Sequence, residues 1–142
     1  MLIYYHGTDE KSINSIIKNG ANVKLGGGEL GQGFYVGSSL WRAFSWAWQK
    51  SNPKNLRCGV IEYSLNEYYF LSLDILCKNR VATQTLYSTL DASNQTNNFN
   101  SGHDAIWTPI VGKNVKDAYQ IKFESKKGEL YINQQNKTVL WQ

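Results

Sequence analysis

Gly33-Phe34-Tyr35-Val36-Gly37-Ser38-Ser39-Leu40 is the segment of this chain that says most about its fold. Its first half is rich in aromatic and β-branched residues and predicts a short strand over residues 33–36. The two serines that follow can cap a helix, because a serine side chain accepts a hydrogen bond from the free N–H groups of a first turn. Apolar residues then recur at helical spacing, at Leu40, Ala43, Phe44, Ala47 and Trp48. The segment therefore predicts a strand followed at once by an amphipathic helix.

Downstream of this segment, the chain alternates between predicted strands and turns. The helix is expected to end near residues 51–53, since Pro53 disfavours a helical conformation in the residue before it. A polar, turn-rich segment over residues 93–102 is predicted to be an exposed loop. The remaining predictions are strands over residues 59–64, 68–73, 104–108, 118–123 and 130–133, and a helix over residues 81–90.

Upstream, Leu2-Ile3-Tyr4-Tyr5 predicts a first strand, and Thr8-Asp9 can cap a first helix that stops at Gly20. Glycines at 26–28 then form a loop that leads into the quoted segment. Short strands mixed with three helices, without regular βαβ alternation, are typical of the α+β class. We therefore expect a single domain over residues 1–142, with a largely antiparallel sheet and flanking helices.

Composition limits the function before any motif is considered. Hydrophobic residues make up 42% of the chain and charged ones 18%, which supports a packed core and excludes wholesale disorder. No apolar run approaches the roughly 20 residues of a membrane-spanning helix, and no basic start precedes an apolar stretch. We therefore expect a cytoplasmic protein with no signal peptide and no membrane contact. Cys58 and Cys77 are expected to be buried thiols, and no cysteine–histidine cluster predicts a metal site.

His6 ends the first predicted strand and precedes Gly7, where the missing side chain lets a ligand approach the backbone. A histidine in this place can hydrogen-bond a ribose hydroxyl, and Gly7 can offer its N–H and C=O to a planar amide. The alternative is a histidine whose ring is satisfied by a backbone carbonyl.

Tyr35 lies on the short strand among glycines and can stack on a flat heterocycle. The alternative is a plain loop–strand–helix junction with Tyr35 in the core. Neither a GxxxxGK[ST] phosphate loop nor a GxGxxG dinucleotide fingerprint occurs in the chain. A nucleotide would therefore be held in some other way.

The late strand over residues 118–123 alternates, with Tyr119, Ile121 and Phe123 on one face. The opposite face carries Gln120, Lys122 and Glu124. We expect this polar face to be solvated; if it lines a cleft, Gln120 can reach a ligand there.

Together, Tyr5-His6-Gly7-Thr8, Gly33-Phe34-Tyr35 with its helix, and Gln120-Ile121-Lys122-Phe123 resemble the ADP-ribosyltransferase superfamily, in its diphtheria-toxin-like and poly(ADP-ribose)-polymerase-like branch. The resemblance implies a split antiparallel sheet, NAD as substrate and no metal. His6 would bond the nicotinamide ribose, Gly7 the carboxamide, and Tyr35 would stack on the nicotinamide ring. The catalytic residues it implies are His6, Tyr35 and Gln120, and the NAD-binding residues His6, Gly7, Thr8, Gly33, Phe34, Tyr35 and Ser39.

Gln120 departs from the pattern of the family, which often has glutamate in this position. A neutral amide can bond a ribose hydroxyl but cannot act as a base or stabilise a cation as a carboxylate does. This favours transfer of a single ADP-ribose over chain elongation. Glu124 and Glu129 are the other candidates for the third position, and Arg42 and Lys24 are candidates to pair with the pyrophosphate.

The resemblance implies a mono-ADP-ribosyltransferase, a bacterial or phage toxin or effector that an antitoxin or immunity protein could neutralise. Its acceptor is a protein side chain or a nucleic acid, which the net charge of +4 would tolerate. Two alternatives stay open. One is an NAD glycohydrolase that passes ADP-ribose to water. The other is a catalytically inactive module that binds a nucleotide or a partner.

Overall fold

The computed structural model describes residues 2–111 and 118–142. Its helices and strands are, in chain order, β1 (Leu2–Asp9), α1 (Glu10–Asn19), β2 (Gly27–Gly28), β3 (Gly31–Gln32), β4 (Phe34–Gly37), α2 (Leu40–Ser51), the 3₁₀ helix η1 (Asn52–Lys54), β5 (Cys58–Leu65), α3 (Glu67–Phe70), β6 (Ile75–Cys77), α4 (Arg80–Ala92), β7 (Ala105–Pro109), β8 (Tyr119–Phe123), α5 (Lys126–Asn133) and β9 (Asn136–Trp141).

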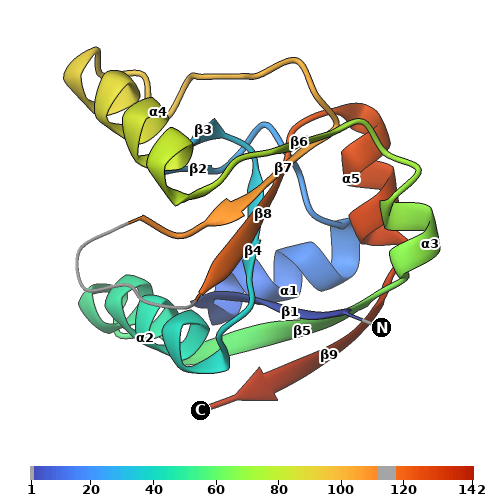
Figure 1. Cartoon of the computed structure of the whole chain (residues 1–142). Helices are drawn as coiled ribbons and strands as arrows, with labels where there is room; N and C mark the ends of the chain where they lie inside the picture. Colours follow the sequence, from blue (N-terminus) through green and yellow to red (C-terminus); the bar gives the residue numbers. More distant parts are fainter. Residues whose placement is uncertain (1, 112–117) are drawn as a thin grey trace.

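Seven of these strands form one sheet in the order β6-β7-β8-β4-β1-β5-β9, and β2 and β3 form a separate small hairpin. Neighbouring strands of the large sheet run antiparallel except β6 and β7, which are parallel. Helices flank this sheet (Figure 1). The predicted α+β class with a largely antiparallel sheet is confirmed.

The sheet divides between its two central strands. Over the described residues, β1 and β4 are paired only at Tyr5 and Gly37, whereas β1 and β5 are paired from one end of β1 to the other. In Figure 1, β4 stands upright and β7 and β8 run obliquely beside it, while β1, β5 and β9 run across the lower part of the molecule. Because the two halves diverge beyond the shared pair, the face next to β1 and β4 opens, as the expected split sheet requires.

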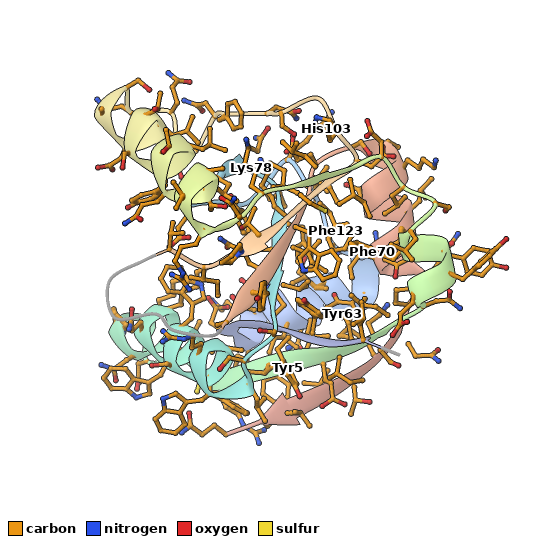
Figure 2. The ribbon with its side chains drawn as sticks, viewed as in Figure 1. Tyr5, Tyr63, Phe70, Lys78, His103 and Phe123 are labelled. Carbon is orange, nitrogen blue, oxygen red and sulfur yellow. The ribbon has the colours of Figure 1, made fainter. Side chains whose placement is uncertain are left out.

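Aromatic rings fill the core on one side of the sheet. Tyr63, Phe70 and Phe123 lie close together near the centre of the molecule (Figure 2), and the rings of Phe70 and Phe123 are 6.4 Å apart. On the other side, α2 packs directly on β1. A Cβ atom on Gly7 would overlap the carbonyl oxygen of Ala43, so the absent side chain sets how closely α2 approaches.

The helix boundaries near the open face follow the predicted signals. Asp9 caps α1 by accepting a hydrogen bond from the N–H of Ser12, and Gly20 ends it with a φ of 86°. Ser39 caps α2 by accepting from the N–H of Arg42, and the helix ends before Pro53. These caps fix where β1 and β4 stop and the helices begin.

Two of the predicted strands are wrong. Residues 68–73 form part of α3 and the turn after it, because the Asn66 side chain accepts a hydrogen bond from the N–H of Tyr69 and starts a helical turn. Residues 130–133 belong to α5, which Ser125 caps through the N–H of Gly128. The final strand is instead β9, which pairs with β5. The described residues therefore hold more helices than the three expected.

Two further expectations concern exposure. Cys58 is buried as predicted, but Cys77 is exposed at the end of the edge strand β6, so that prediction is wrong. The segment over residues 93–102 is largely exposed, as predicted. Within residues 2–111 and 118–142, no helix is both long and apolar enough to cross a membrane.

Candidate functional site

A cleft of about 710 Å³ opens where β1 and β4 diverge. The two strands form its floor, α1 and the glycine-rich loop after it form one wall, and α2 forms the other. His6, Tyr35 and Gln120 all line this cleft. They come from β1, β4 and β8, which are neighbours in the sheet. The structure thus brings together the three residues for which the resemblance implies a catalytic role.

His6 is held at the point where the sheet divides. Its Nδ1 lies 2.7 Å from the carbonyl oxygen of Tyr35, and its ring stacks on Phe34 with centroids 4.3 Å apart. Burial lowers the pKa of His6 from 6.5 to about 4, so the ring is neutral at physiological pH. A neutral ring that donates from Nδ1 to a carbonyl keeps an acceptor at Nε2. His6 therefore satisfies a backbone carbonyl and still offers an acceptor at the cleft.

The low pKa of His6 makes stability depend on pH. The free energy of unfolding is expected to fall as the pH drops from 6.5 to about 4, because only the unfolded chain binds a proton to His6 in this window. His6→Gln should flatten this part of the curve, as measured by urea unfolding at a series of pH values. His103→Gln is the control, because His103 does not line the cleft. Figure 2 shows it on the opposite side of the molecule from Tyr5, the residue before His6. An equally steep curve for His6→Gln would contradict the prediction.

Tyr35 is fastened to the glycine-rich loop. Its hydroxyl donates to the carbonyl of Gly31 at 2.6 Å and accepts from the N–H of Leu30 at 3.1 Å. A Cβ atom on Gly28 would lie 2.9 Å from Cζ of Tyr35, so the backbone of Gly28 packs against the ring. Burial raises the pKa of Tyr35, and the hydroxyl stays protonated. Tyr35 is therefore a fixed aromatic group at the cleft.

The polar face of β8 is buried, and the expectation of a solvated face is wrong. Gln120 is 6% exposed, and its Nε2 donates to Oε2 of Glu29 at 3.0 Å and to Oγ1 of Thr108 at 3.4 Å. The glycine-rich loop, β7 and the segment before β7 supply the hydrogen-bond partners of this face. Buried polar groups are tolerated where such partners exist.

Lys122 and Glu124 on the same face form a fully buried ion pair at 3.0 Å. Lys122 also donates to the carbonyl of Leu30, while Glu124 accepts from the N–H and the hydroxyl of Ser101. Glu124 is thus committed to structure and does not line the cleft. Glu129 on α5 likewise lies away from it, and accepts from the N–H of Val23.

The other residues implied by the resemblance also border the cleft. The cleft is also lined by Gly7, Thr8, Gly33, Phe34 and Ser39. Phe34 is buried in the core and its ring stacks on His6, so its contribution to the cleft is to hold the His6 ring in place. Of the two cations proposed for a pyrophosphate, Arg42 lines the cleft and Lys24 does not.

Two charged residues line the cleft that were not among the predicted site residues. Lys50 lies two helical turns after Arg42 on α2, and Trp46 lies one turn from each of them. The Nζ of Lys50 is 5.5 Å from the ring centroid of Trp46. The i, i+4, i+8 spacing of these three residues is a signal that could have found Lys50. Glu29 stands in the glycine-rich loop, and no local pattern predicts its contact with Gln120, which is 91 positions away.

No protein-family model matches the chain, and neither a curated protein nor a solved structure matches it. The geometry of the cleft and the motifs that line it are therefore the features that bear on function. Among the described residues, no group of three or more His, Cys, Asp or Glu side chains is placed to hold a metal ion.

Proposed function

We propose that this protein is a mono-ADP-ribosyltransferase that cleaves NAD and transfers ADP-ribose to a macromolecular acceptor. The observation that carries the proposal is the convergence of His6, Tyr35 and Gln120, from three neighbouring strands, on one cleft. The volume of about 710 Å³ lies within the range of ligand cavities, about 300–1,000 Å³.

Each group has a part in binding NAD. The free Nε2 of His6 accepts a hydrogen bond from a hydroxyl of the nicotinamide ribose. The ring of Tyr35 stacks on the nicotinamide, and the backbone of Gly7 holds the carboxamide. Arg42 and Lys50, on the cleft side of α2, supply positive charge for the pyrophosphate.

In this reaction the protein acts mainly by orienting NAD, and it forms no covalent bond to the substrate. The bond between C1′ of the ribose and the ring nitrogen breaks, its electron pair leaves with neutral nicotinamide, and positive charge develops at C1′. A lone pair of the acceptor then forms the new bond to C1′, and the proton of the acceptor passes to solvent. Fixing the two halves of the bond in place supplies much of the acceleration.

Exposed tryptophans beside the cleft favour a macromolecular acceptor over water. Trp41 and Trp46 line its α2 wall and are 82% and 53% exposed. Large exposed aromatic side chains are typical of surfaces that bind a second macromolecule. A protein or a single-stranded nucleic acid, whose bases stack on such rings, fits this wall.

Release of nicotinamide from NAD tests the proposal. The wild type is expected to release nicotinamide, and Tyr35→Ala and Gln120→Ala are each expected to reduce the rate by about 100-fold or more, because each removes a group that orients the ribose or the ring. Tyr68→Ala is the control, since Tyr68 is 79% exposed and lies outside the cleft.

The product separates the two enzymatic alternatives. With labelled NAD and a cell extract, transfer gives labelled protein or nucleic acid, whereas hydrolysis gives free ADP-ribose alone. Absence of nicotinamide release together with thermal stabilisation by NAD would contradict the enzymatic proposal and favour a binding module. Absence of both would reject NAD as the ligand.

A further inference from the structure

The cleft contains an amide where the chemistry calls for negative charge. Positive charge develops at C1′ as nicotinamide leaves, and a fixed carboxylate beside it would lower the barrier. Gln120 is neutral and cannot do this. Among the described residues that line the cleft, Glu29 is the one that carries a carboxylate.

Glu29 lies in contact with the amide that occupies the third motif position. Its Oε2 accepts from Nε2 of Gln120 at 3.0 Å and from the backbone N–H of Val111 at 3.2 Å. Its Oε1 has no hydrogen-bond partner in the part of the chain that the structure describes. One oxygen therefore fixes the carboxylate, while within residues 2–111 and 118–142 the other is left without a hydrogen bond.

The chain next to Glu29 is anchored, so the carboxylate has a defined position. Leu30 is fully buried, its N–H donates to the hydroxyl of Tyr35, and its carbonyl accepts from Nζ of Lys122 at 2.7 Å. The charge of Glu29 also reaches Tyr35, where it helps to raise the pKa of the hydroxyl. Glu29 is thus close both to Tyr35, the proposed stacking partner of the nicotinamide, and to Gln120.

We propose that Glu29 is the catalytic carboxylate of this site, supplied from the glycine-rich loop and held in place by Gln120. This role rests on the proposed function. As the bond from C1′ to nicotinamide breaks, Oε1 of Glu29 faces the positive charge that develops on the ribose, and Gln120 becomes a positioning residue. The stoichiometry is unchanged: NAD and the acceptor give nicotinamide, the ADP-ribosylated acceptor and one proton.

The proposal predicts that a glutamate at position 120 lowers the rate of nicotinamide release, whereas a simple replacement of the usual glutamate by Gln120 would predict a rise. If Gln120 merely replaces a glutamate, Gln120→Glu should raise the rate. If Glu29 is the carboxylate, Gln120→Glu places two carboxylates within hydrogen-bond distance, where they cannot both be ionised, and the rate at neutral pH should fall.

The test compares nicotinamide release by the wild type, Glu29→Gln, Gln120→Glu and the double variant that exchanges the two groups. Glu29→Gln keeps the shape and an acceptor oxygen for Gln120, so kcat is expected to fall by about 100-fold with KM changed less than about threefold. The melting temperature should stay within about 2 °C of the wild type. The exchanged variant should recover about tenfold over Glu29→Gln, because it restores one carboxylate beside one amide. Glu62→Gln, on β5 outside the cleft, is the matched control.

Wild-type kcat in Glu29→Gln would overturn the proposal, as would a loss confined to KM or to the melting temperature. A gain in kcat on Gln120→Glu would also overturn it, and would assign the catalytic carboxylate to position 120 on β8. These outcomes leave the proposed function standing, because the wild type still releases nicotinamide. No release by the wild type would overturn the proposed function itself, and the role of Glu29 with it.

Discussion

Lys122→Met is expected to lower the free energy of unfolding by about 3–5 kcal/mol, because it leaves the carboxylate of Glu124 buried without its cation. Both side chains are fully buried and 3.0 Å apart. Burial lowers the pKa of Lys122 and the charge of Glu124 opposes this, so the ammonium is maintained mainly by its partner. Urea unfolding followed by tryptophan fluorescence measures the change.

The matched control is Lys126→Met. Lys126 pairs with Glu129 on the surface of α5 and its side chain is 78% exposed, so its replacement should cost no more than about 0.5 kcal/mol. The double variant Lys122→Met with Glu124→Gln should lose less stability than Lys122→Met alone, because it no longer buries an unpaired charge. Equal stability of Lys122→Met and Lys126→Met would contradict the prediction.

Gly7→Ala is expected to destabilise the protein by more than about 3 kcal/mol, beyond the ordinary cost of overpacking. The added Cβ would overlap the backbone carbonyl of Ala43 in α2, and backbone cannot move aside as the end of a side chain can. Either α2 shifts away from β1 or β1 bends. Both changes displace the floor and one wall of the cleft, so nicotinamide release should fall together with the melting temperature.

Gly37→Ala is the control for this substitution. Gly37 lies on β4, next to β1 in the sheet, and a Cβ there would meet the carbonyl of Tyr119 at an ordinary 3.7 Å. Its effect on the free energy of unfolding is expected to stay within about 1 kcal/mol. If Gly7→Ala were as well tolerated as Gly37→Ala, the close packing of α2 on β1 would not be a requirement of the fold.

Elements with strong local signals were predicted correctly from the sequence. The spacing of apolar residues in α2, the serine before it and the proline after it all agree, and the structure places its ends accordingly. α3 and α5 were mistaken for strands, because Tyr68, Tyr69 and Ile132 favour strands by type. In both places a side-chain cap, from Asn66 or Ser125, starts a helical turn that outweighs this preference.

The candidate site could be predicted only in part, for a similar reason. His6 and Tyr35 were found because each lies in a short stretch with glycines, where the local sequence shows that the backbone is accessible. The burial of Gln120 and its contact with Glu29 depend on a loop that folds over β8 from far away in the chain. When polar side chains alternate along one strand, the sequence does not show whether they are hydrogen-bonded by water or by another part of the protein.

The pairing of β4 with β8 also determines the order in which the cleft can be assembled. During synthesis, His6 and Tyr35 leave the ribosome early, but β1 and β4 are paired with each other only at Tyr5 and Gly37. Gly37, however, pairs with Gln120, and Phe34 with Phe123, so β4 has to wait for a partner made more than eighty residues later. Glu29 gains its contact with Gln120 at the same late step. A nascent chain therefore remains without a finished cleft until β8 has been made, and a chain cut short before β8 never acquires one.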